Sequence, residues 1–275
     1  MDHIRAAIDK ARAERNANSG RPVSSAARST GQGGNQVDAT LSDDWEALSV
    51  FDVVPKQLRR HRIMTHQAGP LATPFDVMRT NLLHEMRKNN WRRVAITSPG
   101  MSCGKTTICL NLAFSLARQY DIRTMVVELD LRRPSIASRL QLEGVNFSRV
   151  LSGEDSAAHH MRRYGHNLAI AASQLTPNSA ELLQGLAAAH QIDEIEARYQ
   201  PDVMLFDMPP MLLVDDTMAF IDQVDAVLLV GAAESSTTQE LSRCKQALDS
   251  RTNLIGVVLN KCRYVDPAEQ YGYGE

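Results

Sequence analysis

Short apolar runs recur along the chain, and between them lie segments whose apolar residues follow helical spacing. The runs that predict buried strands are residues 94–96, 125–130, 167–172, 203–207, 224–230 and 254–259. The segments that predict helices are residues 75–86, 108–117 and 239–248, with a further helix beginning at residue 179. We interpret residues 135–165 as helices and loops. Because short apolar strands that alternate with helices form βαβ units, the pattern predicts an α/β fold. In this fold a mostly parallel, twisted sheet carries helices on both faces.

The two ends of the chain depart from this pattern. Residues 1–16 place apolar side chains on one helical face and predict a short amphipathic helix, either simply solvated or able to dock on a partner. Residues 17–44 are rich in Ser, Gly, Asn, Gln and Thr, so we expect a disordered linker there. The folded domain is then expected at residues 45–263. A polar tail follows at residues 264–275 and contains three of the six tyrosines.

Composition narrows the classes of protein that need to be considered. The chain has 275 residues and a net charge of −2, so its overall charge gives no reason to expect nucleic-acid binding. Its four cysteines lack metal-ligand spacing and indicate free thiols in a reducing compartment. No run approaches the roughly 20 apolar residues of a membrane helix, and the N-terminus lacks an apolar signal core. We therefore expect a cytoplasmic protein that reaches the inner face of the cell membrane only through a partner.

Residues 97–107 form the stretch around which the rest of the chain is organised. A short apolar run precedes this stretch, Gly-Lys-Thr (residues 104–106) lies near its end, and a helical segment follows. A strand, a Gly-containing loop, Gly-Lys-Thr and a helix are the context of a phosphate-binding loop, whose backbone N–H groups face an anion. An ordinary strand-to-helix turn with a surface lysine is the alternative. The predicted nucleotide-binding residues of the loop are Gly100, Met101, Ser102, Cys103, Gly104, Lys105, Thr106 and Thr107.

Carboxylates end two other predicted strands. Glu128 and Asp130 end one of them and, as alternate residues, point to the same side. Asp207 ends another. Ligands of open parallel sheets bind outside the carboxyl ends of the strands, and Mg²⁺ prefers a few oxygen ligands together with water. Thr106, Asp130 and Asp207 are therefore the predicted Mg²⁺ ligands beside the phosphate loop, although acids at strand ends can also merely be solvated or cap the strand.

Three segments together resemble the three Walker motifs of the bacterial tyrosine kinases that serve capsule and exopolysaccharide synthesis. These P-loop NTPases share a fold with the partitioning ATPases. The segments are the loop at residues 97–107, Glu-Leu-Asp-Leu-Arg-Arg-Pro at residues 128–134 and Asp-Met-Pro-Pro at residues 207–210. Residues 178–183 and 257–261 also resemble stretches of this family, and the N-terminal helix and linker resemble its stand-alone cytoplasmic members.

The resemblance implies an ATP-dependent protein-tyrosine autokinase that uses Mg²⁺. The implied catalytic residues are Lys105, Glu128, Asp130 and Asp207, with Lys105 stabilising the transferring phosphoryl charge and a strand-end carboxylate orienting or deprotonating the tyrosine hydroxyl. Asn260 is the implied adenine-binding residue, and Tyr264, Tyr271 and Tyr273 are the implied acceptors. The implied partner is a membrane polysaccharide co-polymerase, with self-association as a further expectation.

This sequence departs from the family pattern at several positions. Glu128 occupies a position where the family has Asp, and residues 101–103 replace a Gly-rich stretch. At the positions of the family's ring-forming helix motif the sequence has Thr73, Asp76 and Arg79, and of these only Arg79 matches. The departures favour one alternative, a degenerate kinase or nucleotide-binding switch that regulates the same polysaccharide machinery.

Two further alternatives fit the residues less well. The partitioning ATPases carry an extra lysine near the start of the loop, where this chain has Gly100. A non-catalytic interaction module would leave Lys105, Asp130 and Asp207 unexplained.

Overall fold

A computed structural model describes residues 44–262, which contain a single sheet of seven strands in the order β3-β4-β2-β5-β1-β6-β7. Only β3 is antiparallel to its neighbour, and every other adjacent pair is parallel. The strands are β1 (Arg93–Thr97), β2 (Thr124–Glu128), β3 (Met161–Tyr164), β4 (Leu168–Ala171), β5 (Val203–Asp207), β6 (Ala226–Ala232) and β7 (Asn253–Asn260). The predicted α/β class is therefore confirmed.

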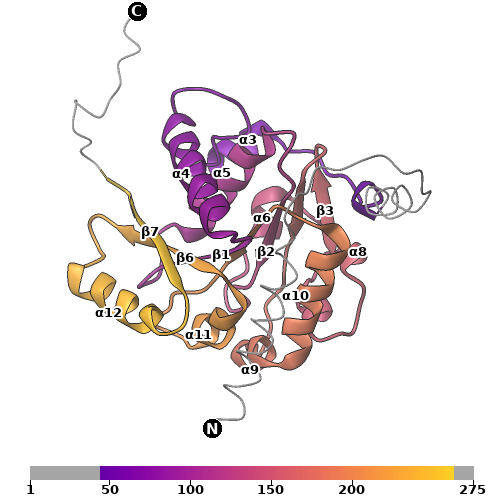
Figure 1. Cartoon of the computed structure of the whole chain (residues 1–275). Helices are drawn as coiled ribbons and strands as arrows, with labels where there is room; N and C mark the ends of the chain where they lie inside the picture. Colours follow the sequence, from indigo (N-terminus) through magenta and orange to yellow (C-terminus); the bar gives the residue numbers. More distant parts are fainter. Residues whose placement is uncertain (1–43, 263–275) are drawn as a thin grey trace, which may run out of the picture. The chain divides into compact units, whose positions relative to one another are not determined.

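Helices cover both faces of the sheet, as Figure 1 shows: α4 and α5 lie on one face, and α10, α11 and α12 lie on the other. The longer helices are α4 (Thr73–Asn89), α5 (Lys105–Ala117), α10 (Leu186–Tyr199) and α12 (Thr238–Asp249). The shorter ones are α3 (Pro55–Arg60), α6 (Ile136–Leu140), α7 (Ser148–Leu151), α8 (Ala157–His160), α9 (Ser179–Gln184), α11 (Asp216–Phe220) and the 3₁₀ helix η1 (Ile221–Gln223). No helix among residues 44–262 is long and apolar enough to span a membrane.

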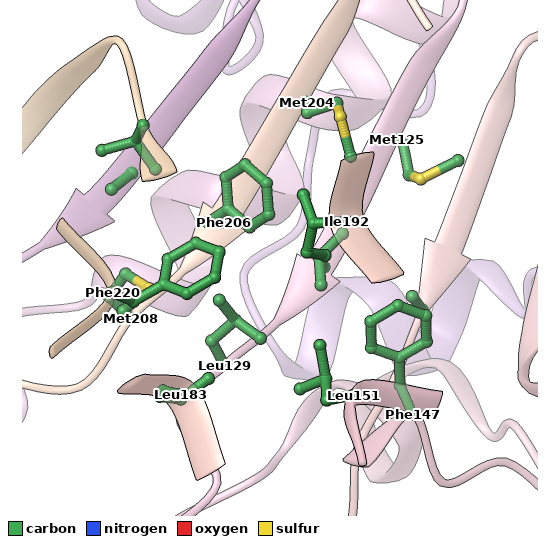
Figure 2. Close-up of a cluster of buried hydrophobic side chains, with 14 of the residues drawn as sticks. Met125, Leu129, Phe147, Leu151, Leu183, Ile192, Met204, Phe206, Met208 and Phe220 are labelled. Carbon is green, nitrogen blue, oxygen red and sulfur yellow. The ribbon is translucent and has the colours of Figure 1, made fainter. Parts of the chain in front are cut away.

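The sheet carries a hydrophobic core on each face. Figure 2 shows part of the core under α10 and α11, where the Phe206 ring of β5 lies against the Phe220 ring of α11 with centroids 5.3 Å apart. Strands β1, β2, β4, β5 and β6 are buried along their whole length. Burial on both faces explains why these strands read as continuous apolar runs. It also fixes the positions of the loops that leave their carboxyl ends.

The six strands and four helices predicted from the apolar pattern are present. The interpretation of residues 135–165 as helices and loops was incomplete, because β3 lies in this segment and pairs with β4 at the edge of the sheet. Within β3 only Met161 is fully buried, while Arg162, Arg163 and Tyr164 are half-buried. A four-residue edge strand with two arginines carries no continuous apolar run, so the apolar pattern misses it.

The segments predicted at the two ends of the chain fall almost entirely outside the described residues. This applies to the expected helix at residues 1–16, to the expected linker at residues 17–44 apart from its last residue, and to the tail at residues 264–275. These expectations remain predictions.

Candidate functional site

The phosphate loop connects β1 to α5, as the sequence predicts. Gly104 is the residue before the first turn of α5 and has a φ of 96°, a left-handed conformation that glycine adopts without steric cost. Ser102 also lies in the left-handed region, with a φ of 60°, although it carries a Cβ. The loop therefore takes the conformation that a Gly-rich sequence would favour while holding a serine at one of its turns.

Lys105 and Thr106, at the start of α5, contact one carboxylate each. Lys105 Nζ lies 2.7 Å from Asp130 Oδ2, and Thr106 Oγ1 donates a hydrogen bond of 2.7 Å to Asp207 Oδ2. Asp130 follows β2 and Asp207 ends β5, and β5 lies between β1 and β2 in the sheet. The parallel sheet thus brings together four of the predicted site residues from three separate segments.

Asp207 has the features of a cation ligand. Its side chain is fully buried, and its second oxygen, Oδ1, has no hydrogen-bond partner among the described residues. Burial is the main reason why the pKa of Asp207 is raised to about 6; the Lys105 charge and the Thr106 hydrogen bond oppose this rise, and the nearby Asp130 charge adds to it. A bare carboxylate oxygen beside a threonine hydroxyl fits the oxygen donor set of Mg²⁺. Thr106, Asp130 and Asp207 would hold this ion, and it would neutralise phosphate charge.

Glu128 is placed differently from the other predicted catalytic residues. Its side chain is fully buried, and its Oε1 accepts hydrogen bonds from the backbone N–H groups of Ser135 (2.5 Å) and Ile136 (2.8 Å). Its Oε2 accepts a third, from the Ser173 N–H at 3.0 Å. The carboxylate thereby ties the end of β2 to the start of α6 and to the residues that follow β4. Its predicted role toward the tyrosine hydroxyl remains a prediction, since the hydrogen bonds of its carboxylate within the described residues are all with backbone groups.

Asn260, at the end of β7, contacts the phosphate loop directly. Its side-chain Nδ2 donates a hydrogen bond of 2.9 Å to the Cys103 carbonyl, and its Oδ1 accepts one of 2.8 Å from the Lys261 N–H. A Cβ added to Gly104 would lie 2.2 Å from Asn260 Nδ2. Asn260 therefore fixes the loop from the side of β7, and its predicted contact with adenine remains a prediction.

These contacts predict the effect of changing Gly104. The substitution Gly104→Ala places a Cβ in the left-handed region and displaces the Asn260 amide from its hydrogen bond, so it should lower the free energy of unfolding by about 1–3 kcal/mol. Urea denaturation measures this. Gly100→Ala is the matched control, because a Cβ there meets nothing within 4 Å, and it should change stability by less than about 0.5 kcal/mol. Equal losses in the two variants would contradict the prediction.

A pocket of about 550 Å³ opens over the phosphate loop. Six of the eight predicted loop residues line it, namely Met101, Ser102, Gly104, Lys105, Thr106 and Thr107, together with Asp130. Gly100 and Cys103 are not among the lining residues: the Cys103 thiol is buried and donates to the Gly100 carbonyl at 3.3 Å.

Sequence reasoning missed several residues of this pocket. They are the basic residues Arg132, Arg133, Arg139 and Lys261 and the apolar residues Leu213 and Val214. Arg132 and Arg133 lie within the segment at residues 128–134 and were given no separate role. Lys261 follows directly after Asn260, which was predicted, so its position at the end of the last strand was the available signal.

Two other groups of predicted residues have different outcomes. Asp76 and Arg79, at positions of the family's ring motif, lie in α4 and contact α5, where Arg79 donates to the Ser115 carbonyl at 3.0 Å and Asp76 pairs with Arg118. The predicted acceptors Tyr264, Tyr271 and Tyr273 lie outside the described residues.

The family model of the CobQ/CobB/MinD/ParA nucleotide-binding domain matches residues 94–270. The chain belongs to this family, and it is a nucleotide-binding P-loop domain. It is 27% identical to the tyrosine-protein kinase YwqD of Bacillus subtilis (strain 168) over 214 residues, which is 76% of this chain and 89% of YwqD. It is also 26% identical to the tyrosine-protein kinase CpsD of Streptococcus pneumoniae serotype 4, covering 68% of this chain and 82% of CpsD.

A solved structure agrees with these relatives. The kinase domain of the Escherichia coli tyrosine kinase ETK superposes with a TM-score of 0.65 at 25% identity, covering 75% of this chain and 82% of that domain. The resemblance to bacterial tyrosine kinases that the sequence motifs indicate is confirmed.

Proposed function

We propose that this protein is an ATP-dependent protein-tyrosine kinase that regulates exopolysaccharide or capsule synthesis or export and phosphorylates tyrosines of its own C-terminal tail. The observation that carries the proposal is the pair of contacts Lys105–Asp130 and Thr106–Asp207 at the phosphate loop. The tyrosine-protein kinases YwqD and CpsD, which the chain matches over most of their length, support it.

The reaction transfers the γ-phosphoryl group of ATP to a tyrosine oxygen. The phenolic oxygen forms the new bond to phosphorus, the bond to the β,γ-bridging oxygen breaks, ADP leaves and the phenolic proton is released. Such a transfer depends mostly on positioning and charge stabilisation. The loop N–H groups would bind the phosphates. Lys105 would leave its ion pair with Asp130 and turn toward the nucleotide. There it would stabilise the charge that develops on the leaving and transferring oxygens.

The setting that we propose is cytoplasmic, with a membrane polysaccharide co-polymerase as partner and with self-association of the kinase. The proposal includes no nucleic acid. Relatives whose names place them in polysaccharide loci, such as a putative tyrosine-protein kinase in the cps region of Klebsiella pneumoniae, support this setting.

A second candidate is a nucleotide-binding switch of the same polysaccharide machinery. The contacts of Glu128 favour it, because this carboxylate is engaged by three backbone N–H groups. A switch needs the Lys105 and Mg²⁺ sites to bind nucleotide but needs no group that activates a tyrosine hydroxyl.

Incubation of the purified full chain with Mg-ATP, followed by phosphotyrosine detection, separates the two candidates. We expect phosphotyrosine in the wild type and a loss of at least 90% of it when Tyr264, Tyr271 and Tyr273 are all changed to Phe. The matched control is Tyr120→Phe, an exposed tyrosine outside the tail, which should keep its signal. ATP binding without any phosphotyrosine in the wild type would overturn the kinase proposal in favour of the switch.

A further inference from the structure

Three basic side chains in the pocket form no ion pair with a carboxylate in the described part of the chain. Of the five that line it, Lys105 pairs with Asp130, and Arg132 lies 2.9 Å from the buried Asp216. Arg133 and Lys261 are both exposed, and neither pairs with a carboxylate among the described residues.

Within residues 44–262, Arg139, the third of these side chains, donates hydrogen bonds to neutral groups, and its positive charge also acts on the buried Asp207. Its Nε donates to Ser135 Oγ at 3.1 Å, and its guanidinium donates to Thr107 Oγ1 at 3.3 Å. The pocket therefore carries three basic side chains that form no ion pair within residues 44–262, although the charge of Arg139 is partly offset by the nearby Asp207. Such positive charge attracts an acidic ligand.

An apolar surface completes the same pocket. Pro209, Pro210, Leu213 and Val214, from the loop that follows β5, line it, and Leu213 is 54% exposed. An aromatic ring packs favourably on such a surface, and a phenolic hydroxyl can remain in a polar environment at the same time. The lining suits a tyrosine side chain flanked by acidic residues.

We propose that Arg133, Arg139 and Lys261 select acidic tyrosine-containing segments as phosphoryl acceptors, and that residues 264–275 are such a segment. This proposal rests on the proposed kinase function. The segment contains three tyrosines and three acids, Asp266, Glu269 and Glu275, and no lysine or arginine. Its charge is thus opposite to that of the three unpaired side chains.

The position of the segment in the chain allows this contact. It begins three residues after Lys261, itself a pocket residue. Tyr271 is ten residues from Lys261, which allows a separation of up to about 35 Å. The acceptor can come from the same chain or from a second copy, since the chemistry is the same.

The nucleotide phosphates are the competing explanation for these three charges. The loop N–H groups, Lys105 and a Mg²⁺ ion held by Thr106, Asp130 and Asp207 would already bind the phosphates, whereas Arg133, Arg139 and Lys261 are the side chains of the described pocket that would recognise an acidic peptide. An experiment must nevertheless separate the two ligands.

The first test measures binding of a fluorescently labelled peptide with the sequence of residues 264–275 to the full chain carrying Tyr264→Phe, Tyr271→Phe and Tyr273→Phe, by fluorescence anisotropy. In this background Arg133→Glu should raise the Kd for the peptide at least tenfold and should raise the Kd for Mg-ATP by a clearly smaller factor, since the loop N–H groups and Lys105 still bind the phosphates. A peptide with Asp266→Asn, Glu269→Gln and Glu275→Gln should bind at least tenfold more weakly than the acidic peptide and should be insensitive to Arg133→Glu. The control Arg87→Glu, at an exposed site of α4, should leave both Kd values unchanged.

Three results would overturn the proposal: equal binding of the acidic and neutral peptides, no response to Arg133→Glu, or a weakened Mg-ATP Kd with an unchanged peptide Kd. Because these are binding measurements, they decide the inference even where no phosphate is transferred. Absence of transfer to the bound peptide would count against the kinase function alone.

A mixing experiment identifies the source of the acceptor. Chains with Lys105→Ala and an intact tail are combined with active chains whose tail tyrosines are Phe. Phosphotyrosine on the Lys105→Ala chains shows an acceptor from a second copy. Its absence, with a wild-type rate per molecule that is independent of concentration, shows the same chain.

Discussion

Lys105→Ala is expected to lower the rate of phosphotyrosine formation by about a thousandfold, since removing a positioned charge that stabilises a phosphoryl-transfer transition state costs roughly this much. Lys105 is the cation at the start of α5 and is only 13% exposed in its side chain, so bulk water does not screen it fully. The measurement is the initial rate of phosphotyrosine formation at saturating Mg-ATP. We expect the loss mainly in kcat, because the loop N–H groups still bind the phosphates.

The structure also predicts a side effect of this substitution. Asp130, 5% exposed in its side chain, loses its ion-pair partner, and its remaining hydrogen bond within residues 44–262 is that from the Arg133 N–H at 3.2 Å. A thermal denaturation curve must therefore accompany the rate, so that unfolding is not read as lost catalysis. Lys88→Ala is the control, since Lys88 is exposed and forms a surface ion pair with Glu85. A Lys105→Ala variant that folds normally and retains more than a tenth of the wild-type rate would contradict the assigned role.

The sheet was predictable because its inner strands are buried on both faces. A strand such as Val203–Asp207 must be apolar along its length, and this leaves a run that the sequence shows directly. The edge strand Met161–Tyr164 follows no such rule. Its pairing depends on β4 rather than on its own composition, so neighbouring structure and not local sequence decides that it is a strand.

The site divides in the same way. The contacts of Lys105 and Thr106 follow from the order of the strands, because the carboxyl ends of parallel neighbours meet at one edge. The hydrogen bonds of Glu128 do not follow from alternation along β2. Alternation sets the side of the strand but not the partners, and one partner, Ser173, lies 45 residues away. Asn260 and the Cys103 carbonyl are separated by 157 residues, and only the folded sheet places them together.

Glu128 provides the second large effect, a dependence of stability on pH. Burial, the largest cause, raises its pKa from the usual 4.5 to about 7 against the lowering effect of its backbone hydrogen bonds. Between these pH values the folded chain binds more protons at Glu128 than the unfolded chain, so the stabilising contribution is complete below pH 4.5 and is lost as pH rises to 7. The predicted loss is about 3 kcal/mol over this range, at about 1.4 kcal/mol per unit.

Urea denaturation at pH 5 and pH 7.5, on the wild type and on Glu128→Gln, measures this contribution. The pKa of Asp207 is raised as well, so Glu128→Gln keeps the part of the pH dependence that comes from Asp207. For each protein, the loss of unfolding free energy between pH 5 and pH 7.5 gives the slope of its stability against pH. The Glu128 contribution is the difference between the slopes of the wild type and Glu128→Gln, and Glu128→Gln should show the smaller slope. It should also be less stable than the wild type at pH 5 by about 1–3 kcal/mol, because an amide NH₂ replaces an acceptor of the Ser173 N–H.

The same variant tests what Glu128 does in the reaction. If the carboxylate fixes the start of α6 and the residues that follow β4, Glu128→Gln should keep the rate of phosphotyrosine formation within about tenfold of the wild type, since general-base catalysis typically contributes about 10²–10⁴. A loss of a hundredfold or more in a folded protein would instead assign the proton-accepting role to Glu128, and the carboxylate would then have to leave its three backbone donors during the reaction. Equal slopes in the two proteins would show that Glu128 does not titrate in this range, and the pH dependence would belong to Asp207.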